Sequence, residues 1–162
     1  MKKLNVVLLI VLILMLAFVA YFFIGGTLHA QASIATAPAS DYPDVCKSIT
    51  NIVNSGAAPQ QFAALPPSPS GCTLVDMTIT LTNPGLFEAE WIDISVSPAD
   101  GDIAVYSLTG ESSTLSARAT GQVNLKLVTS APADAARRIT LDYYVFGMLR
   151  SVTIEAVRPK AA

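Results

Sequence analysis

The side chains of this chain that could support chemistry are few and widely spaced. The 162 residues include two cysteines, Cys46 and Cys72, and a single histidine, His29. A zinc site needs three or four His, Cys or acidic ligands that converge, and a Ser-His-Asp site needs a histidine beside the serine. His29 lies at the edge of the apolar N-terminal run and precedes the predicted domain, and no glycine-rich phosphate loop follows a strand. We therefore predict no metal, no cofactor, no small-molecule substrate and no enzymatic activity.

The two cysteines bracket a helical and proline-rich insert over residues 44–72. Cysteines in an oxidising compartment most often pair, and a disulfide between Cys46 and Cys72 would stabilise the fold by ~3–4 kcal/mol in the chain-entropy picture. Their spacing is not the C-x-x-C of a redox pair. We expect a structural disulfide.

Three groups of charged residues have plain structural interpretations. Glu88 and Glu90 share one parity and are expected on a solvated strand face. The Asp-Gly-Asp of residues 100–102 is typical of a turn, with a calcium site as the alternative, although the longer acidic ladder of such sites is missing. Arg137 and Arg138 are expected at a solvated strand edge that discourages aggregation.

Aromatic residues supply the one candidate functional surface. Trp91 is expected in the core near a bulge, with an exposed contact position as the alternative. Tyr143 and Tyr144 have opposite parity in a strand, so one of them must face outward, and Phe146 shares the parity of Tyr144. Exposed apolar patches often mark partner surfaces. We predict such a surface from Tyr144 and Phe146, with Trp91 as a further member.

Composition limits the class of protein. Hydrophobic residues make up 52% of the chain and charged residues 14%, against about 25% charged in a typical soluble domain. So little charge excludes a disordered polyelectrolyte. A net charge of -2 argues against a nucleic-acid partner, which would require a basic face.

An uninterrupted apolar run near the N-terminus accounts for much of this composition. Residues 6–24 read VVLLIVLILMLAFVAYFFI, nineteen residues without a charge. At a rise of ~1.5 Å per residue this helix would be about 28 Å long, close to the ~30 Å hydrocarbon core of a bilayer. Gly25 and Gly26 end the run. We predict a transmembrane anchor over residues 1–26 that contacts membrane lipid.

The distribution of positive charge predicts the orientation of this anchor. Lys2 and Lys3 precede the span, and Lys47 is the first basic residue after it. The positive-inside rule then places the N-terminus in the cytoplasm and the rest of the chain outside. The alternative is a signal peptide cleaved near Ala32, which would make the protein secreted, but signal h-regions usually run only ~7–15 residues.

Two segments separate the anchor from the main domain. Residues 27–43 are small, polar and proline-bearing, which favours an extended linker. In residues 44–72 the apolar residues follow a helical stripe over 44–56, residues 59–65 suggest another helical turn, and the prolines of 66–71 require a loop.

From residue 73 the hydrophobic period changes to two, which is typical of half-buried antiparallel strands. A phase slip near Trp91 predicts a bulge or a change of sheet, and Gly147 predicts a tight hairpin. The fold class is mainly β: a seven-stranded immunoglobulin- or fibronectin-III-like sandwich over residues 73–158, with a small barrel as the alternative and a tail at 159–162. The seven strands are expected at residues 74–82, 87–96, 102–108, 113–117, 122–129, 138–146 and 148–157.

The segment TLTNPGLF at residues 80–87, followed by alternating strands and a final YYVFG hairpin at residues 143–147, resembles the membrane-tethered LEA14/WHy type of β-sandwich. That resemblance covers roughly residues 74–157. It implies a sandwich fold and a protective or interaction role, and it supplies no catalytic residues.

These observations predict a non-catalytic protein. We expect a single-pass cell-membrane protein whose extracytoplasmic sandwich is an interaction module or an accessory subunit of a membrane or envelope complex, with other membrane or envelope subunits as partners. The alternative is a structural subunit of a surface filament or envelope layer. The absence of a pilin-type leader before the apolar run argues against that alternative.

Overall fold

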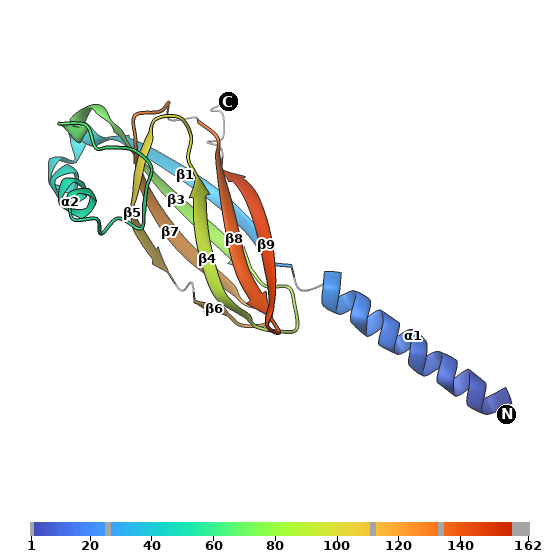
Figure 1. Cartoon of the computed structure of the whole chain (residues 1–162). Helices are drawn as coiled ribbons and strands as arrows, with labels where there is room; N and C mark the ends of the chain where they lie inside the picture. The colour runs from blue at the N-terminus through green and yellow to red at the C-terminus, as the bar shows by residue number, and fades with distance from the viewer. Residues whose placement is uncertain (1, 25–26, 111–112, 133–134, 157–162) are drawn as a thin grey trace.

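The computed structural model describes residues 2–24, 27–110, 113–132 and 135–156; the predicted tail at 159–162 and the Gly25–Gly26 helix end lie outside them. The first element is a long apolar helix, α1 (Lys2–Ile24), which projects away from the rest of the chain (Figure 1). Its side chains at residues 3–21 are exposed, and it is long and apolar enough to cross a membrane. An N-terminal signal sequence would have the same properties.

The rest of the described chain forms two antiparallel sheets that face each other. The first sheet has the strand order β1-β3-β7-β5-β2 and the second has the order β6-β4-β8-β9. The strands are β1 (His29–Pro38), β2 (Gln60–Gln61), β3 (Thr73–Thr82), β4 (Ala89–Ser97), β5 (Asp102–Gly110), β6 (Thr114–Leu115), β7 (Thr120–Thr129), β8 (Arg137–Val145) and β9 (Met148–Ala156). The mainly-β sandwich prediction is confirmed, and β3 to β9 match the seven predicted strands.

The described residues form nine strands, two more than the seven that were predicted. The chain segment expected to be a linker forms β1, which pairs with β3 along its whole length, from His29 opposite Thr82 to Pro38 opposite Thr73. Its inward-facing residues include Ala30 and Ala32, which are too small to produce a clear hydrophobic period. The second missed strand, β2, replaces the helical turn that was expected at residues 59–65.

The core lies between the sheets and is built from alternating strand residues. Side chains of β3, β7, β4 and β8 fill most of it, and Tyr143 is among the largest that are fully buried. At ~25 cal/mol per Å² of buried apolar surface, this interior supplies the main driving force for folding. Other members are Met77, Ile79, Leu81, Ile94, Val96, Val123, Leu125, Leu127, Ile139 and Leu141.

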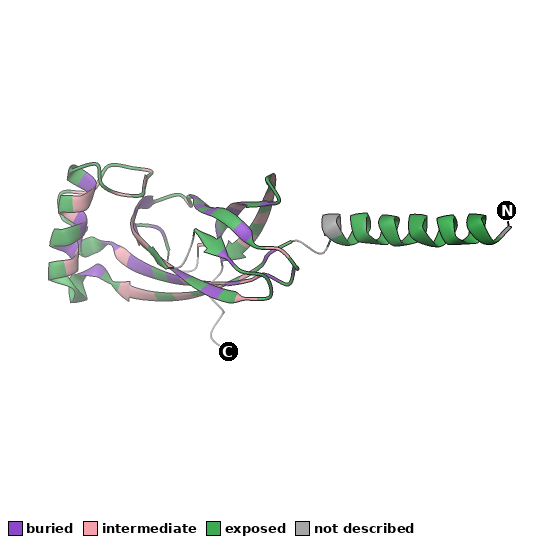
Figure 2. Ribbon diagram, turned by 90° about the horizontal axis from the view of Figure 1, so that it is seen from below, coloured by how far each residue is buried: buried purple, intermediate pink, exposed green. Residues whose placement is uncertain are grey.

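A second apolar cluster lies on the outer face of the first sheet. Helix α2 (Pro43–Asn54), which confirms the predicted helix, packs Ile49 and Val53 against Leu74 and Val128. Two short 3-10 helices, η1 (Ala39–Asp41) and η2 (Pro69–Gly71), lie beside it. We call the end that carries α2 the distal end, and the opposite end, where β1 begins and the β8–β9 hairpin turns, the base (Figures 1 and 2).

Both sides of the sandwich are closed by contacts between the sheets. On one side β1 lies beside β9. On the other side the Gln60 side-chain amide donates to the Ile94 carbonyl at 3.1 Å and accepts from the Val96 amide at 3.0 Å. These bonds satisfy backbone groups of β4 that would otherwise form an open strand edge.

Candidate functional site

The predicted disulfide is absent, because Cys46 and Cys72 are free thiols in this structure. Both are buried in the second apolar cluster, where they behave as small hydrophobic side chains. The Cys46 Sγ donates to the Ala39 carbonyl at 3.1 Å. Burial raises the pKa of the Cys72 thiol, and the neighbouring Cys46 raises it further. Both effects favour a protonated Cys72 thiol in the folded protein.

Arg137 is not at a solvated edge as predicted. Its guanidinium is fully buried and forms a two-pronged ion pair with Asp102, through Nη2 to Oδ1 at 2.6 Å and Nε to Oδ2 at 3.0 Å. Asp102 Oδ2 also accepts from the Ala99 amide at 2.8 Å, and Arg137 Nη1 donates to the Ala135 carbonyl at 3.0 Å. The Asp-Gly-Asp segment forms a turn, and the carboxylate of Asp102, at the start of β5 in the first sheet, is bonded to Arg137 at the start of β8 in the second sheet.

The remaining acidic residues do not converge. Glu88 and Glu90 are exposed, as expected. Among the described residues no group of three or more His, Cys, Asp or Glu side chains lies close enough together to hold a metal ion.

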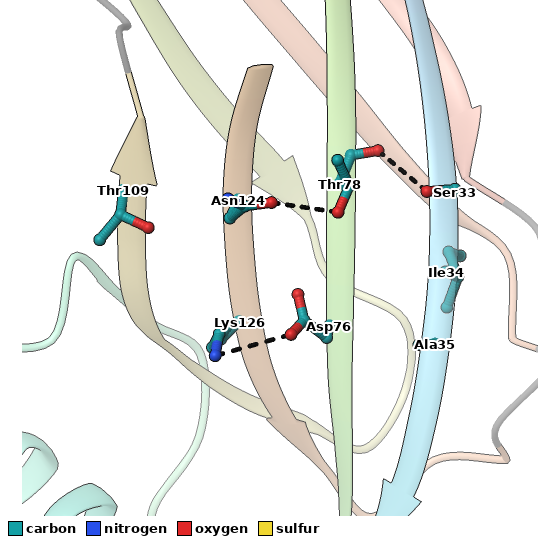
Figure 3. Close-up of a pocket in the computed structure, with 8 residues that line it drawn as sticks. All are labelled: Ser33, Ile34, Ala35, Asp76, Thr78, Thr109, Asn124 and Lys126. Carbon is teal, nitrogen blue, oxygen red and sulfur yellow. Dashed lines mark hydrogen bonds and ion pairs between the residues drawn. The ribbon is translucent and has the colours of Figure 1, made fainter.

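The outer face of the first sheet carries a polar depression of about 470 Å³ (Figure 3). Its side chains pair with one another across the strands: Thr78 Oγ1 donates to Asn124 Oδ1 at 3.0 Å, and Lys126 Nζ lies 3.6 Å from Asp76. Cross-strand pairs of this kind stabilise a sheet. The depression therefore presents paired polar groups, and none of them is a nucleophile next to a base.

A larger groove of about 760 Å³ adjoins this depression at the distal end. It runs between α2 and the sheet, and Val45, Ile52 and Leu74 give it an apolar floor beside Tyr42 and Tyr106. Burial, together with the negative charge of Asp76, raises the pKa of Tyr106. The Tyr106 hydroxyl thus stays neutral and acts as a polar rim to the groove.

The candidate partner surface predicted from the aromatic residues forms at the base. Trp91 is 76% exposed, Phe146 66% and Tyr144 39%, while Tyr143 points into the core. The exposed alternative for Trp91 is therefore the one that the structure adopts. Leu86 and Leu149 are also exposed at this end, and they were not predicted. We call these five residues, Leu86, Trp91, Tyr144, Phe146 and Leu149, the basal patch.

Strand register brings three members of the basal patch together: Trp91, Tyr144 and Leu149. Tyr144 on β8 lies opposite Glu90 of β4 and opposite Leu149 of β9. The register of β4 shifts between Glu90 and Asp93, which confirms the predicted bulge and turns Trp91 outward with φ at 53°. Trp91 and Tyr144 thereby line one shallow hollow of about 320 Å³.

The hairpin turn holds Phe146 in place. Phe146 and Gly147 both have positive φ, 55° and 71°, as a two-residue type I′ turn between twisted strands requires. The Phe146 ring packs edge-to-face on Phe87 with ring centroids 4.4 Å apart. Edge-to-face pairs contribute ~0.5–1.5 kcal/mol beyond area burial, so Phe146 is exposed but held in a defined orientation.

The connection from α1 is fastened to the same end of the sandwich. Leu28, 1% exposed, is part of the main core, and its backbone amide donates to the Tyr143 hydroxyl at 2.9 Å. Burial raises the pKa of Tyr143, although the Leu28 bond and the positive charge of Arg150 lower it in part. The hydroxyl therefore remains a neutral acceptor. The burial of Leu28 in the core was not predicted, because Leu28 is an isolated apolar residue at the start of the expected linker.

Comparison with known proteins gives no family. No family model matches the chain, and no curated protein matches it. The GAE domain of GGA2p from Saccharomyces cerevisiae is similar in structure with a TM-score of 0.43 and 16% identity, covering 54% of this chain and 80% of that chain. The yeast GGA1 GAE domain has a TM-score of 0.43 and 11% identity, covering 53% of this chain and 80% of that chain.

A FixG-related protein from Vibrio parahaemolyticus has a TM-score of 0.36 and 10% identity, covering 80% of this chain and 96% of that chain. These similarities are weak, and they assign neither a family nor a function to this chain. The resemblance to the LEA14/WHy type stays a prediction.

Proposed function

We propose that this protein is a single-pass membrane protein whose extracytoplasmic β-sandwich is a non-catalytic interaction module, acting as an accessory subunit of a membrane or envelope complex. Helix α1 would be the anchor, with Lys2 and Lys3 on the cytoplasmic side. The basal patch would be the contact surface.

One observation supports this proposal most directly. Beyond α1, the described residues expose six large hydrophobic side chains, and five of them are in the basal patch. The sixth is Tyr42 at the distal end. Singly scattered apolar residues are ordinary on a soluble surface, whereas a contiguous group marks a contact. Fixed aromatic rings suit this role because little side-chain entropy is lost when they are covered.

The experiment compares the assembly state of the full chain with that of patch variants. The chain is extracted from its own membrane in mild detergent and weighed by native mass spectrometry. We expect co-eluting subunits with the wild type and their loss in Phe146→Ser/Leu149→Ser. The matched control is Tyr42→Ser, an exposed aromatic at the distal end, which should keep the complex.

A wild-type chain that runs alone at 17.0 kDa plus bound detergent would contradict the accessory-subunit role. Equal loss of subunits in the Tyr42→Ser control would show that the basal patch is not the contact surface.

A further inference from the structure

We infer that the basal patch lies in the lipid headgroup region of the same membrane that α1 spans, so that the sandwich stands with its base on the bilayer and α2 pointing away from it. This inference rests on the proposed function, because it requires α1 to be a membrane anchor. It names lipid as the substance that covers the patch in the chain on its own, and the partner subunits of the proposed complex would displace this lipid when they bind.

Chain length places the patch within reach of the bilayer. Helix α1 ends at Ile24 and β1 begins at His29. An extended chain advances at most ~3.3–3.6 Å per residue, so the end of the span and the start of β1 are separated by no more than about 18 Å. Leu28 is buried in the core and bonded to Tyr143, which fixes the last part of this connection to the base. The base therefore cannot move far from the headgroups.

The contact between Leu28 and Tyr143 also places the patch relative to the span. The Tyr143 hydroxyl accepts a hydrogen bond from the Leu28 amide on the core side of β8. Tyr144, the next residue, belongs to the basal patch and lies on the outer side of the same strand. Leu149 lies opposite Tyr144, and Phe146 lies in the turn that joins the two strands. The entry point of the chain thus contacts the same hairpin that carries Tyr144, Phe146 and Leu149 of the basal patch.

The residue types suit a lipid interface better than a polar surface. Trp and Tyr are enriched at the headgroup level, where the ring contacts acyl chains and its polar group stays hydrated. Apolar faces of interfacial segments are buried about 5–10 Å into this region. Glu90 lines the hollow beside Trp91 and Tyr144. We therefore expect contact with zwitterionic lipid and no requirement for anionic lipid or low salt.

The chain offers its own probe, because Trp91 is the single tryptophan and belongs to the basal patch. The full chain is reconstituted at high dilution in phosphatidylcholine vesicles with bromine on the acyl chains near the headgroups. We expect bromine to lower Trp91 emission about twofold or more, because interfacial tryptophan lies at that depth. The loss should persist at high salt and should not change with protein-to-lipid ratio.

Two variants control the measurement. Trp91→Phe/Tyr42→Trp moves the single tryptophan to the distal end, where bromine should leave the emission unchanged. Phe146→Ser/Leu149→Ser keeps Trp91 but removes two apolar neighbours, and it should weaken the quenching while circular dichroism shows an intact fold. Reduced quenching in this variant ties the effect to the patch.

The outcomes separate the two proposals. If alkaline carbonate releases the chain from the vesicles, α1 is not an anchor, and both proposals fail. If the chain stays in the membrane but Trp91 is unquenched, or is quenched no more than Trp at position 42, lipid does not cover the patch. That result overturns this inference and leaves a protein partner as the contact. Quenching that depends on protein density would indicate a second copy and would also overturn it.

Discussion

Asp102 and Arg137 show how much of this fold depends on individual buried side chains. Both side chains have no exposed surface, and every bond of the pair lies inside the sandwich. Removing one partner of a buried ion pair leaves an uncompensated charge, which usually costs ~3–5 kcal/mol. Replacing both partners by apolar residues of similar size is often close to neutral.

We therefore expect Asp102→Ala to lower the free energy of unfolding by ~3–5 kcal/mol, and Asp102→Leu/Arg137→Met to recover most of the loss. Urea unfolding of the full chain in detergent micelles measures both. The control is Asp100→Ala, an exposed residue of the same turn. A single variant as stable as the wild type would contradict the account.

Asn83 is a second buried polar residue on which the fold depends. Its Nδ2 donates to the Phe87, Leu115 and Ser116 carbonyls, and its Oδ1 accepts from the Gly85 amide at 3.0 Å. Asn83→Ala removes these four bonds from largely buried backbone groups, so we expect a loss of ~2–3 kcal/mol in the free energy of unfolding. Thermal and urea unfolding test this, with the exposed Asn54→Ala as control. No loss beyond that of the control would show that the bonds are unimportant.

The raised pKa of Cys72 predicts how stability depends on pH. The unfolded thiol loses its proton near pH ~8.5, whereas the folded thiol keeps its proton to higher pH. The contribution of this group is therefore complete below pH ~8.5 and is lost as the pH rises from there toward the folded-state pKa. We expect the free energy of unfolding to fall as the pH rises above ~8.5, and to fall less in Cys72→Ala. Identical pH profiles for the two chains would contradict this.

At the scale of elements, most of the sandwich could be predicted because period-two alternation marks strands with one buried face. The strands β3, β4, β7, β8 and β9 have large inward residues, so their pattern is clear. β1 could not be found in this way because its inward positions include alanines. The hydrogen-bond ladder with β3 is what holds this segment as a strand. β2 spans only two residues and is set by tertiary contacts.

The candidate site could be predicted only in part. Parity predicts that one of Tyr143 and Tyr144 faces outward, and this prediction is confirmed, with Tyr144 as the outward residue. Whether Trp91 faces the core or the solvent depends on the geometry of the bulge in β4, which the residue types alone do not reveal. The ion pair of Arg137 with Asp102, 35 residues apart in sequence, arises from the packing of two sheets and has no local signal.

Helix α2 gives a prediction at this scale. Ile49 is fully buried against the outer face of the first sheet, while Lys47 on the same helix is exposed. Truncating a buried isoleucine costs ~2–5 kcal/mol, so Ile49→Ala should destabilise the distal end by about that amount and speed native alkylation of Cys46 and Cys72. Thiol labelling followed by mass spectrometry measures this. Lys47→Ala should label at the wild-type rate; faster labelling in that control would mean that the thiols are not protected by α2.

For the whole molecule, the arrangement joins one apolar helix to one sandwich through a short connection. The apolar surface of the described sandwich is concentrated at the end that receives this helix, and the distal end carries α2 and its groove. The proposed function and the lipid contact both depend on α1 remaining in the mature protein and on the sandwich being outside the cell.

Labelling of lysines in intact cells tests this claim most directly. A membrane-impermeant amine reagent is added, the membranes are washed with alkaline carbonate, and the retained chain is analysed by intact mass and by peptide mapping. We predict a carbonate-resistant chain that keeps residues 1–26, with label on Lys47 before permeabilisation and on Lys2 and Lys3 only after it. A soluble chain that begins near residue 33, or label on Lys47 only after permeabilisation, would contradict the account.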